Sequence, residues 1–167
     1  MKTLRVSAGL VSAIIGGSLA LIPAQADAAI QRPFQADSGD ACLYGATEGV
    51  LAWQYGFRTS PLPLRAVDVK GTVTDHPVTD DPGFACRDDG YSTTASFTAY
   101  SGLAIVAEKS ATANNAVVDF AFTFTSTTNT GQITRIVVRV CRNPLVTLPP
   151  SYCGKPAEYN APPVAGP

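Results

Sequence analysis

The stretch that decides the fold is Val118–Thr125, which reads VDFAFTFT. Its apolar residues recur at every second position, and this spacing places alternate side chains on one face of a β-strand. Val118 and the three phenylalanines after it share one face, and Asp119, Ala121, Thr123 and Thr125 share the other. We expect the phenylalanines to anchor a core, because each aromatic side chain of this size buries roughly 150 to 250 Å².

The same period of two recurs before and after this stretch. In residues 91–100 the face that begins at position 91 is the expected core face, and in residues 67–73 the valines share a face opposite polar side chains. Residues 133–141 alternate as well, and residues 49–57 form an apolar segment that carries the only tryptophan. Each of these segments is therefore expected to be a strand.

The connections between these strands give the fold class. Residues 103–107 are expected to form a hairpin partner, followed by a polar turn over residues 108–115. Residues 59–63 hold two prolines and are expected to connect strands, since proline cannot donate to a β-ladder. About six strands without helix signals are typical of an all-β, antiparallel two-sheet β-sandwich. We predict this fold, immunoglobulin-like in outline only, because the cysteine and tryptophan spacing of immunoglobulin domains is absent.

The two ends of the chain depart from the alternation. Lys2 and Arg5 precede an apolar run, and small residues suited to a cleavage site follow it, as in secretory signal peptides. The expected divisions are a signal peptide over 1–28, an irregular N-terminal arm over 29–41, the β-sandwich domain over 42–153 and an irregular C-terminal tail over 154–167.

The composition restricts the class of partner. Of the 167 residues, 15% are charged and 46% are hydrophobic, and the formal net charge is −1. The closest approach to a basic cluster is Arg135, Arg139 and Arg142, whereas a phosphate backbone is bound by denser groups of Lys and Arg. After Ile22 no apolar run reaches the roughly 18 to 20 residues that cross a bilayer. We therefore expect a secreted, extracellular protein that binds no nucleic acid and inserts into no membrane.

Four cysteines follow residue 28, an even number that is typical of disulfides in an exported protein. Of the three formal pairings we favour Cys42–Cys86 and Cys141–Cys153, since the second closes a short proline-rich loop directly after a predicted strand. A zinc site would need CxxC-type spacing or several histidines, and His76 is the only histidine. Two disulfides are therefore predicted.

The segments around these cysteines resemble a group of small secreted proteins. They are Cys42–Gly45, which reads CLYG, Cys86–Tyr91, which reads CRDDGY, Val140–Arg142 and Tyr152–Gly154. This layout resembles small secreted proteins of actinobacteria of unknown function. The resemblance implies an extracellular location and a β fold, and it implies no functional residues.

An acidic segment is the first candidate site. Residues 75–89 gather five carboxylates and the only histidine. Asp80, Asp81, Asp88 and Asp89 are candidate calcium ligands, because calcium takes about six to eight oxygen ligands in irregular geometry. The alternative is turn chemistry, in which aspartates before proline or glycine bond their own backbone. The EF-hand spacing is missing, which favours the turn interpretation.

The same segment supports an alternative function, a small secreted hydrolase. A carboxylate pair such as Asp81 and Asp89 would suit glycoside hydrolysis if the fold held the two groups roughly 5 to 9 Å apart. A triad of His76, Asp75 and a serine such as Ser92 lacks both the G-x-S-x-G elbow and an oxyanion loop. We assign no catalytic residue and no cofactor, and we expect a protein that is not an enzyme.

Aromatic side chains are a second candidate site. Tyr44, Tyr55, Tyr100 and Trp53 have rings that could stack on sugars, as aromatics do in carbohydrate-binding modules. Trp53 lies in an apolar segment, so a place in the core is the better expectation for it.

The third candidate is the loop between Cys141 and Cys153. A disulfide and three prolines would restrict this loop, which lowers the ordering cost of binding a partner. Leu145, Val146 and Leu148 would then be apolar anchors. The alternative is that these side chains cover the open end of the sandwich, and that the disulfide fixes a tail that would otherwise fray.

These observations predict a secreted, non-enzymatic interaction domain. It would recognise an extracellular protein or a cell-envelope component through the Cys141–Cys153 loop. The rival functions are the hydrolase built on residues 75–89 and a purely structural envelope protein without a discrete site.

Overall fold

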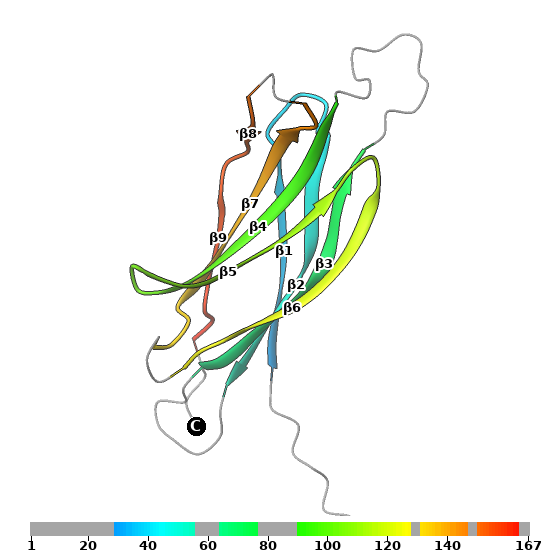
Figure 1. Ribbon diagram of the computed structural model, residues 1–167. Helices are drawn as coiled ribbons and strands as arrows, with labels where there is room; N and C mark the ends of the chain where they lie inside the picture. Colours follow the sequence, from blue (N-terminus) through cyan, green and yellow to red (C-terminus); the bar gives the residue numbers. More distant parts are fainter. Residues whose placement is uncertain (1–28, 56–63, 77–89, 128–130, 147–149, 164–167) are drawn as a thin grey trace, which may run out of the picture.

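Two antiparallel β-sheets make up the structure. The computed structural model describes residues 29–55, 64–76, 90–127, 131–146 and 150–163 (Figure 1). The predicted signal peptide and the predicted connection over 59–63 lie outside these residues. The described residues form no helix, and the all-β prediction is confirmed.

Nine strands run through the described residues, three more than the alternation alone indicated. They are β1 (Ala29–Asp37), β2 (Gly45–Tyr55), β3 (Leu64–Asp75), β4 (Tyr91–Ser101), β5 (Ala104–Ala113), β6 (Val117–Thr125), β7 (Arg135–Pro144), β8 (Tyr152–Cys153) and β9 (Ala157–Asn160). Sheet A has the order β1-β2-β3-β6, and sheet B has the order β5-β4-β7-β8, with β9 also paired to β7. Every pairing is antiparallel.

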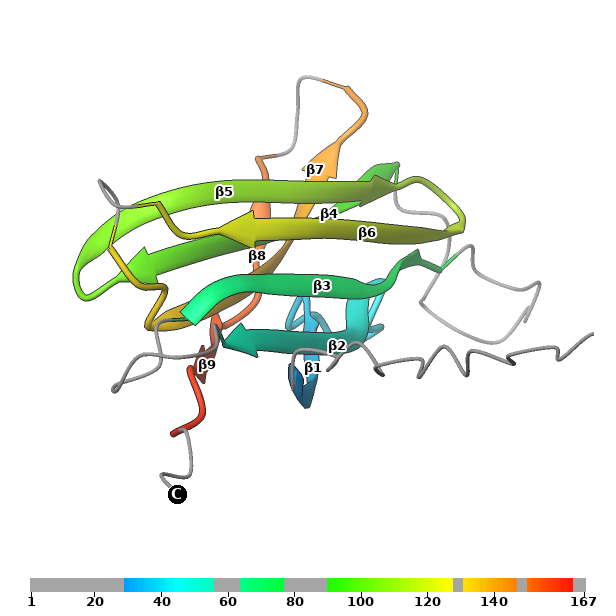
Figure 2. The same cartoon turned by 90° about the horizontal axis from the view of Figure 1, so that it is seen from below.

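The inward faces of the two sheets share one apolar core. Figure 2 shows β3 and β2 of sheet A below β4 and β7 of sheet B. As the alternation predicted, Phe97 of β4 and Val138 of β7 are fully buried, and Trp53 of β2 is buried with them. Phe34 of β1 meets Phe97 across the sheets with ring centroids 5.4 Å apart, in an edge-to-face arrangement.

A pair of glycines makes room for the Phe34 ring. Gly49 of β2 lies opposite Gly71 of β3 in the sheet register. A Cβ atom on Gly49 would lie only 2.8 Å from Phe34 Cε1, and one on Gly71 would lie 3.0 Å from Phe34 Cζ. Gly71 therefore interrupts the valine face of β3 at the position where the Phe34 ring from the edge strand β1 needs the space.

The phenylalanines of β6 are buried to different extents. Phe124 is buried, Phe120 and Phe122 are half-buried, and Val118 is exposed. β6 and β5 are the free edges of the two sheets and lie side by side without a hydrogen-bonded ladder, so this side of the core is less covered (Figure 2). The prediction of an aromatic anchor holds for Phe124 and only in part for its neighbours.

The polar segment over 108–115 was expected to be a turn, and that expectation was wrong for most of it. β5 continues to Ala113, paired to β4. Glu108 and Ser110 lie opposite outward-facing residues of β4, so their polar side chains reach water while their backbone stays in the ladder.

The predicted irregular arm over 29–41 was also wrong, because Ala29–Asp37 forms β1. Pro33 weakened the strand pattern in the sequence, but β1 is an edge strand, where proline is tolerated. The N–H of Gln35 donates to Tyr159 Oη at 2.9 Å, so alternate residues of β1 turn their backbone away from β2. Pro33 shares that side, and its missing N–H costs no ladder bond.

The predicted irregular tail over 154–167 likewise contains β9. Tyr159 of β9 both accepts from the Gln35 N–H and donates to the Gln35 carbonyl at 2.9 Å. Its phenol closes part of the exposed edge of β1, and so the C-terminal segment helps to hold the two sheets together.

Candidate functional site: the loop end

One end of the molecule carries a group of exposed apolar and aromatic side chains. We call this group the loop end, and it consists of Leu43, Leu145, Val146 and Tyr152. They are exposed to 54%, 54%, 69% and 36%, respectively. They come from the turn between β1 and β2, the segment after β7, and β8, which gather at the upper end in Figure 1.

The turn that presents Leu43 is organised by Asp40. Its Oδ1 accepts the N–H groups of Cys42 and Tyr44, both at 3.1 Å, and its other carboxylate oxygen accepts the Ser38 hydroxyl. Burial pushes the pKa of Asp40 upward, but these hydrogen bonds and the charge of Arg142 outweigh it and lower the pKa. The turn is therefore held around an ionised carboxylate.

Leu43 itself adopts a left-handed backbone with φ of 48°. A leucine in this conformation is uncommon, and it places the side chain outward over the turn. The Leu43 N–H donates to the Asp40 carbonyl at 3.1 Å, which fixes the backbone there.

A buried ion pair lies beneath the loop end. Arg142 of β7 donates to the carboxylate of Asp75, the last residue of β3, and to the Thr93 hydroxyl of β4. The two charged side chains are only 1% and 0% exposed. The Asn115 N–H donates to the second Asp75 oxygen at 3.2 Å. Because Asp75 ends a strand of sheet A and Arg142 belongs to sheet B, the pair ties the two sheets together at this end.

Aromatic rings cover this ion pair. The Arg142 guanidinium carbon lies 5.4 Å from the centre of the Tyr44 ring and 5.9 Å from that of Tyr91. The Tyr91 ring in turn packs against Tyr152, with centroids 5.6 Å apart. This gives a continuous path of contacts from the buried charge to the surface.

The segment with Leu145 and Val146 is anchored at Leu145 and through the disulfide that precedes it. The predicted disulfide Cys141–Cys153 is present and joins opposed residues of β7 and β8. Leu145 N–H donates to the Gly90 carbonyl at 2.9 Å, and Gly154 N–H donates to the Val140 carbonyl at 2.9 Å. The backbone that carries the apolar side chains is therefore held at several points.

Several predicted site residues lie outside the described residues. These are Leu148 of the loop, Cys86, and the candidate calcium ligands Asp80, Asp81, Asp88 and Asp89. Within the described residues there is one disulfide rather than the two that were predicted, although Cys42 carries no free thiol. The pairing Cys42–Cys86 stays a prediction.

The hydrolase alternative loses the role it gave to Asp75. This carboxylate is fully buried and paired with Arg142, so it does not orient His76. His76 is exposed, and Ser92 donates its hydroxyl to the Asn143 carbonyl at 3.3 Å. The structure does not bring these three residues together as a triad. No cluster of three or more metal-ligating side chains occurs in the part of the chain that the structure describes.

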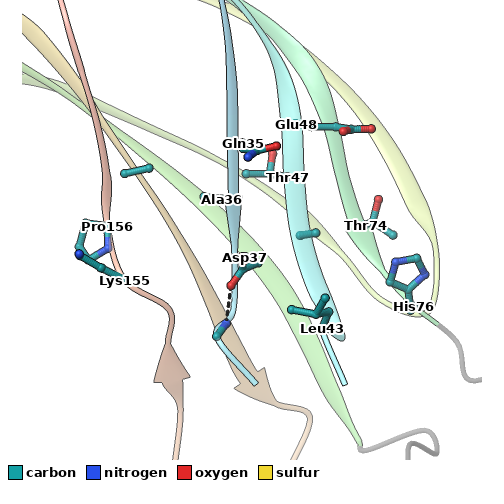
Figure 3. Close-up of a pocket in the computed structure, with 13 residues that line it drawn as sticks. Gln35, Ala36, Asp37, Leu43, Thr47, Glu48, Thr74, His76, Lys155 and Pro156 are labelled. Carbon is teal, nitrogen blue, oxygen red and sulfur yellow. Dashed lines mark hydrogen bonds between the residues drawn. The ribbon is translucent and has the colours of Figure 1, made fainter. Parts of the chain in front are cut away.

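A shallow hollow of about 820 Å³ borders the loop end at Leu43. Four titratable side chains line the hollow. They are Asp37 on β1, Glu48 on β2, His76 after β3 and Lys155 before β9. Figure 3 shows Lys155 and His76 on opposite sides of β1, with the Asp37 carboxylate accepting the Gly39 N–H at 2.9 Å. The hollow is an open surface feature that extends the loop end along sheet A.

The aromatic candidates separate into buried and exposed groups. Trp53 and Tyr55 are buried, and Tyr55 donates its hydroxyl to the Pro162 carbonyl at 2.6 Å. Burial raises the pKa of Tyr55, and the nearby charge of Arg32 lowers it by less. Tyr100 stays on the outer face of sheet B, beneath the Arg135 guanidinium at 4.3 Å from the ring centre.

The ion pair of Arg142 and Asp75 was not predicted, although the alternation in the sequence indicates it. Arg142 continues the inward face of Ile136, Val138 and Val140, and Asp75 continues that of the β3 valines. A charged residue on each of two inward faces predicts that the two are paired, because a buried charge is kept only with a partner.

Comparisons of the chain with protein-family models, curated proteins and solved structures found no match. Among the described residues there is no helix of the length and apolarity that a membrane crossing requires. The proposal below therefore rests on the geometry of the chain itself.

Proposed function

We propose that the protein is a secreted, non-enzymatic interaction domain that binds an extracellular protein through its loop end. In this proposal the two sheets form a β-sandwich, and a second disulfide, Cys42–Cys86, stabilises it beside Cys141–Cys153. A cell-envelope component is the alternative partner, and calcium or another cofactor is not required.

The observation that carries this proposal is the exposure of Leu145 and Val146 on a backbone that is anchored at Leu145. Leu145 is 54% exposed and Val146 is 69% exposed, so both present hydrophobic surface to water. Here the disulfide and the hydrogen bond from Leu145 to Gly90 restrain the segment before any partner arrives. Restraint in the free protein lowers the entropic cost of binding.

The neighbouring side chains favour a protein as the partner. Tyr152 lies opposite Arg142 in the pairing of β7 with β8 and is 36% exposed, and Leu43 adds a further apolar group. Tyrosine and apolar anchors at the centre of a patch, with polar groups at its rim, are typical of protein interfaces. Asp40 and Asn143 supply such polar groups next to the loop end.

Secretion is supported by the charge and apolar pattern of residues 1–28 and by the disulfide. Disulfides persist in oxidising compartments and are rare where thiols are kept reduced. The Cys141–Cys153 bond is therefore in keeping with an extracellular protein.

Affinity capture with matched variants tests the proposed surface. The bait is the chain from Ala29 onward, offered to the culture filtrate and to the cell-wall fraction of its own host. The test variant is Leu145→Ser/Val146→Ser. The control is Ile105→Ser/Val117→Ser, which removes two apolar side chains of similar exposure, 57% and 64%, from the free edges β5 and β6.

We expect the wild type and the control to retain one filtrate protein, and the test variant to lose it. Retention that is equal in all three baits would contradict the proposal. Retention by the cell wall alone, with the same dependence on the loop end, would replace the protein partner with an envelope component.

A further inference from the structure

The outer face of sheet B carries rows of mostly polar side chains, in which paired residues of neighbouring strands lie side by side. One row runs from Ser110 through Ser96 to Arg139, and the next runs from Glu108 through Thr98 and Val137 to Glu158. In a third row Tyr100 lies opposite Arg135. We call these residues the polar face. It lies on a different part of the molecule from the loop end.

The arginines of the polar face have hydrogen-bond donors that the described part of the protein does not occupy. Thr98 donates its hydroxyl to Glu108 at 3.3 Å, and the Arg135 guanidinium lies on the Tyr100 ring. Neither Arg135 nor Arg139 forms an ion pair with any carboxylate in the described residues. The guanidinium groups therefore keep most of their donors for water or a ligand.

The polar face is hollowed across the strands. Two depressions of about 310 and 350 Å³ share Ser96, Thr98, Glu108 and Arg139 in their linings, so they form one trough. The trough crosses β5, β4 and β7 and reaches β9 at Glu158. An elongated ligand can therefore lie across the strands.

The charge balance and chemistry of the trough select among ligand classes. Arg135, Arg139 and Lys109 oppose Glu108 and Glu158, which leaves one net positive charge. This is too little for a nucleic acid or an anionic membrane surface, which are bound by clustered basic groups. The trough also lacks the apolar centre that protein interfaces have.

An uncharged sugar chain fits this combination. Its hydroxyl groups both donate and accept, so they can satisfy guanidinium donors and carboxylate acceptors side by side. Serine and threonine hydroxyls can serve either role, and the apolar surface of Val137 can lie against the C–H faces of the sugars.

We propose that the polar face of sheet B is a binding site for an uncharged oligosaccharide. Arg139 and Glu108 make the central hydrogen bonds, and Arg135 on Tyr100 forms one end of the site. This site acts independently of the loop end, and the proposal does not depend on the proposed function.

Calorimetric titration with defined sugars tests the site. The probes are the uncharged hexasaccharides of β-1,4-linked glucose, xylose, mannose and N-acetylglucosamine, each at millimolar concentration, with heparin as the anionic probe. The variants are Arg139→Ala and Glu108→Gln. The matched control is Lys70→Ala, which removes an exposed cation from the outer face of sheet A.

We expect at least one uncharged probe to bind, and each test variant to weaken this binding at least about tenfold, the effect of a lost hydrogen bond to a charged group. Lys70→Ala and Leu145→Ser/Val146→Ser should bind as the wild type does, and all variants should keep its thermal unfolding. The proposal is overturned if no uncharged probe binds, if only heparin binds, or if Lys70→Ala weakens binding as much as Arg139→Ala does.

Discussion

At the scale of single residues, Arg142 decides how the loop end is built. It is among the largest fully buried side chains, and its charge is balanced by Asp75 across the two sheets. Buried ion pairs contribute little net stability when formed, but the loss of one partner leaves an uncompensated charge in the interior. The pair therefore specifies one arrangement of β3 against β7.

Replacing Arg142 alone should be costly. We expect Arg142→Met to lower the free energy of unfolding by about 3 to 5 kcal/mol, because the Asp75 carboxylate stays buried without a cation. The double variant Arg142→Met/Asp75→Leu should recover most of this loss. Denaturant titration of the four proteins in the double-mutant cycle measures both effects. A loss for Arg142→Met no greater than that for the exposed Arg139→Met would contradict the role given to the pair.

Asp40 should make the turn of residues 38–44 sensitive to acid. Its pKa in the folded protein lies below its ordinary value of 3.8, so its stabilising effect is fully present above that pH and is lost as the pH falls through the folded value. We expect wild type to be more stable than Asp40→Asn at neutral pH. The difference in thermal midpoint between the two proteins should shrink below about pH 4. A difference that stays constant to pH 2 would show that the charge of Asp40 does not hold the turn.

At the scale of elements, the opposed glycines Gly49 and Gly71 let β2 and β3 pack closely beneath the Phe34 ring. A Cβ atom on Gly49 would press into the Lys70 carbonyl and lie 2.6 Å from the Gly71 Cα. These are backbone atoms, which move only if the strands separate. The glycine pair therefore keeps β2 and β3 close while the Phe34 ring packs over them.

Gly49→Ala should destabilise the protein by about 1 to 3 kcal/mol, the usual cost of overpacking a well-filled core. Gly102→Ala is the contrast, because a Cβ atom there meets nothing within 4 Å, although its φ of 59° adds backbone strain. The second variant tests strain without crowding. If thermal unfolding shows the two substitutions to be equally harmful, crowding around Gly49 is not the reason for the glycine pair.

The strands that could be predicted from sequence are those with long alternation. The inward faces of β4 and β7 follow the pattern residue by residue, since both strands lie inside sheet B. β1 and β9 could not be predicted, because short or proline-containing strands are held by pairing with distant neighbours. β6 was predicted, but its burial depends on its place at a sheet edge, which the alternation does not encode.

At the scale of the whole molecule, the candidate site was predicted in part. The loop and its disulfide followed from the cysteine spacing, and two of its three predicted anchors are exposed as expected. Leu43 and Tyr152 were not predicted, because only the fold brings the first turn and β8 to the same end. Arg142 was grouped with Arg135 and Arg139 as the closest approach to a basic cluster, whereas its position in the alternation places it inside.

The central claim is that the partner contacts the loop end, and photo-crosslinking tests it most directly. A photo-reactive amino acid is placed at position 146 in one protein and at position 70, on the outer face of sheet A, in another. Both proteins are illuminated in the culture filtrate of the host. We predict one adduct of discrete mass from position 146 and none from position 70. The absence of an adduct at position 146, or the same adduct from both positions, would contradict the account.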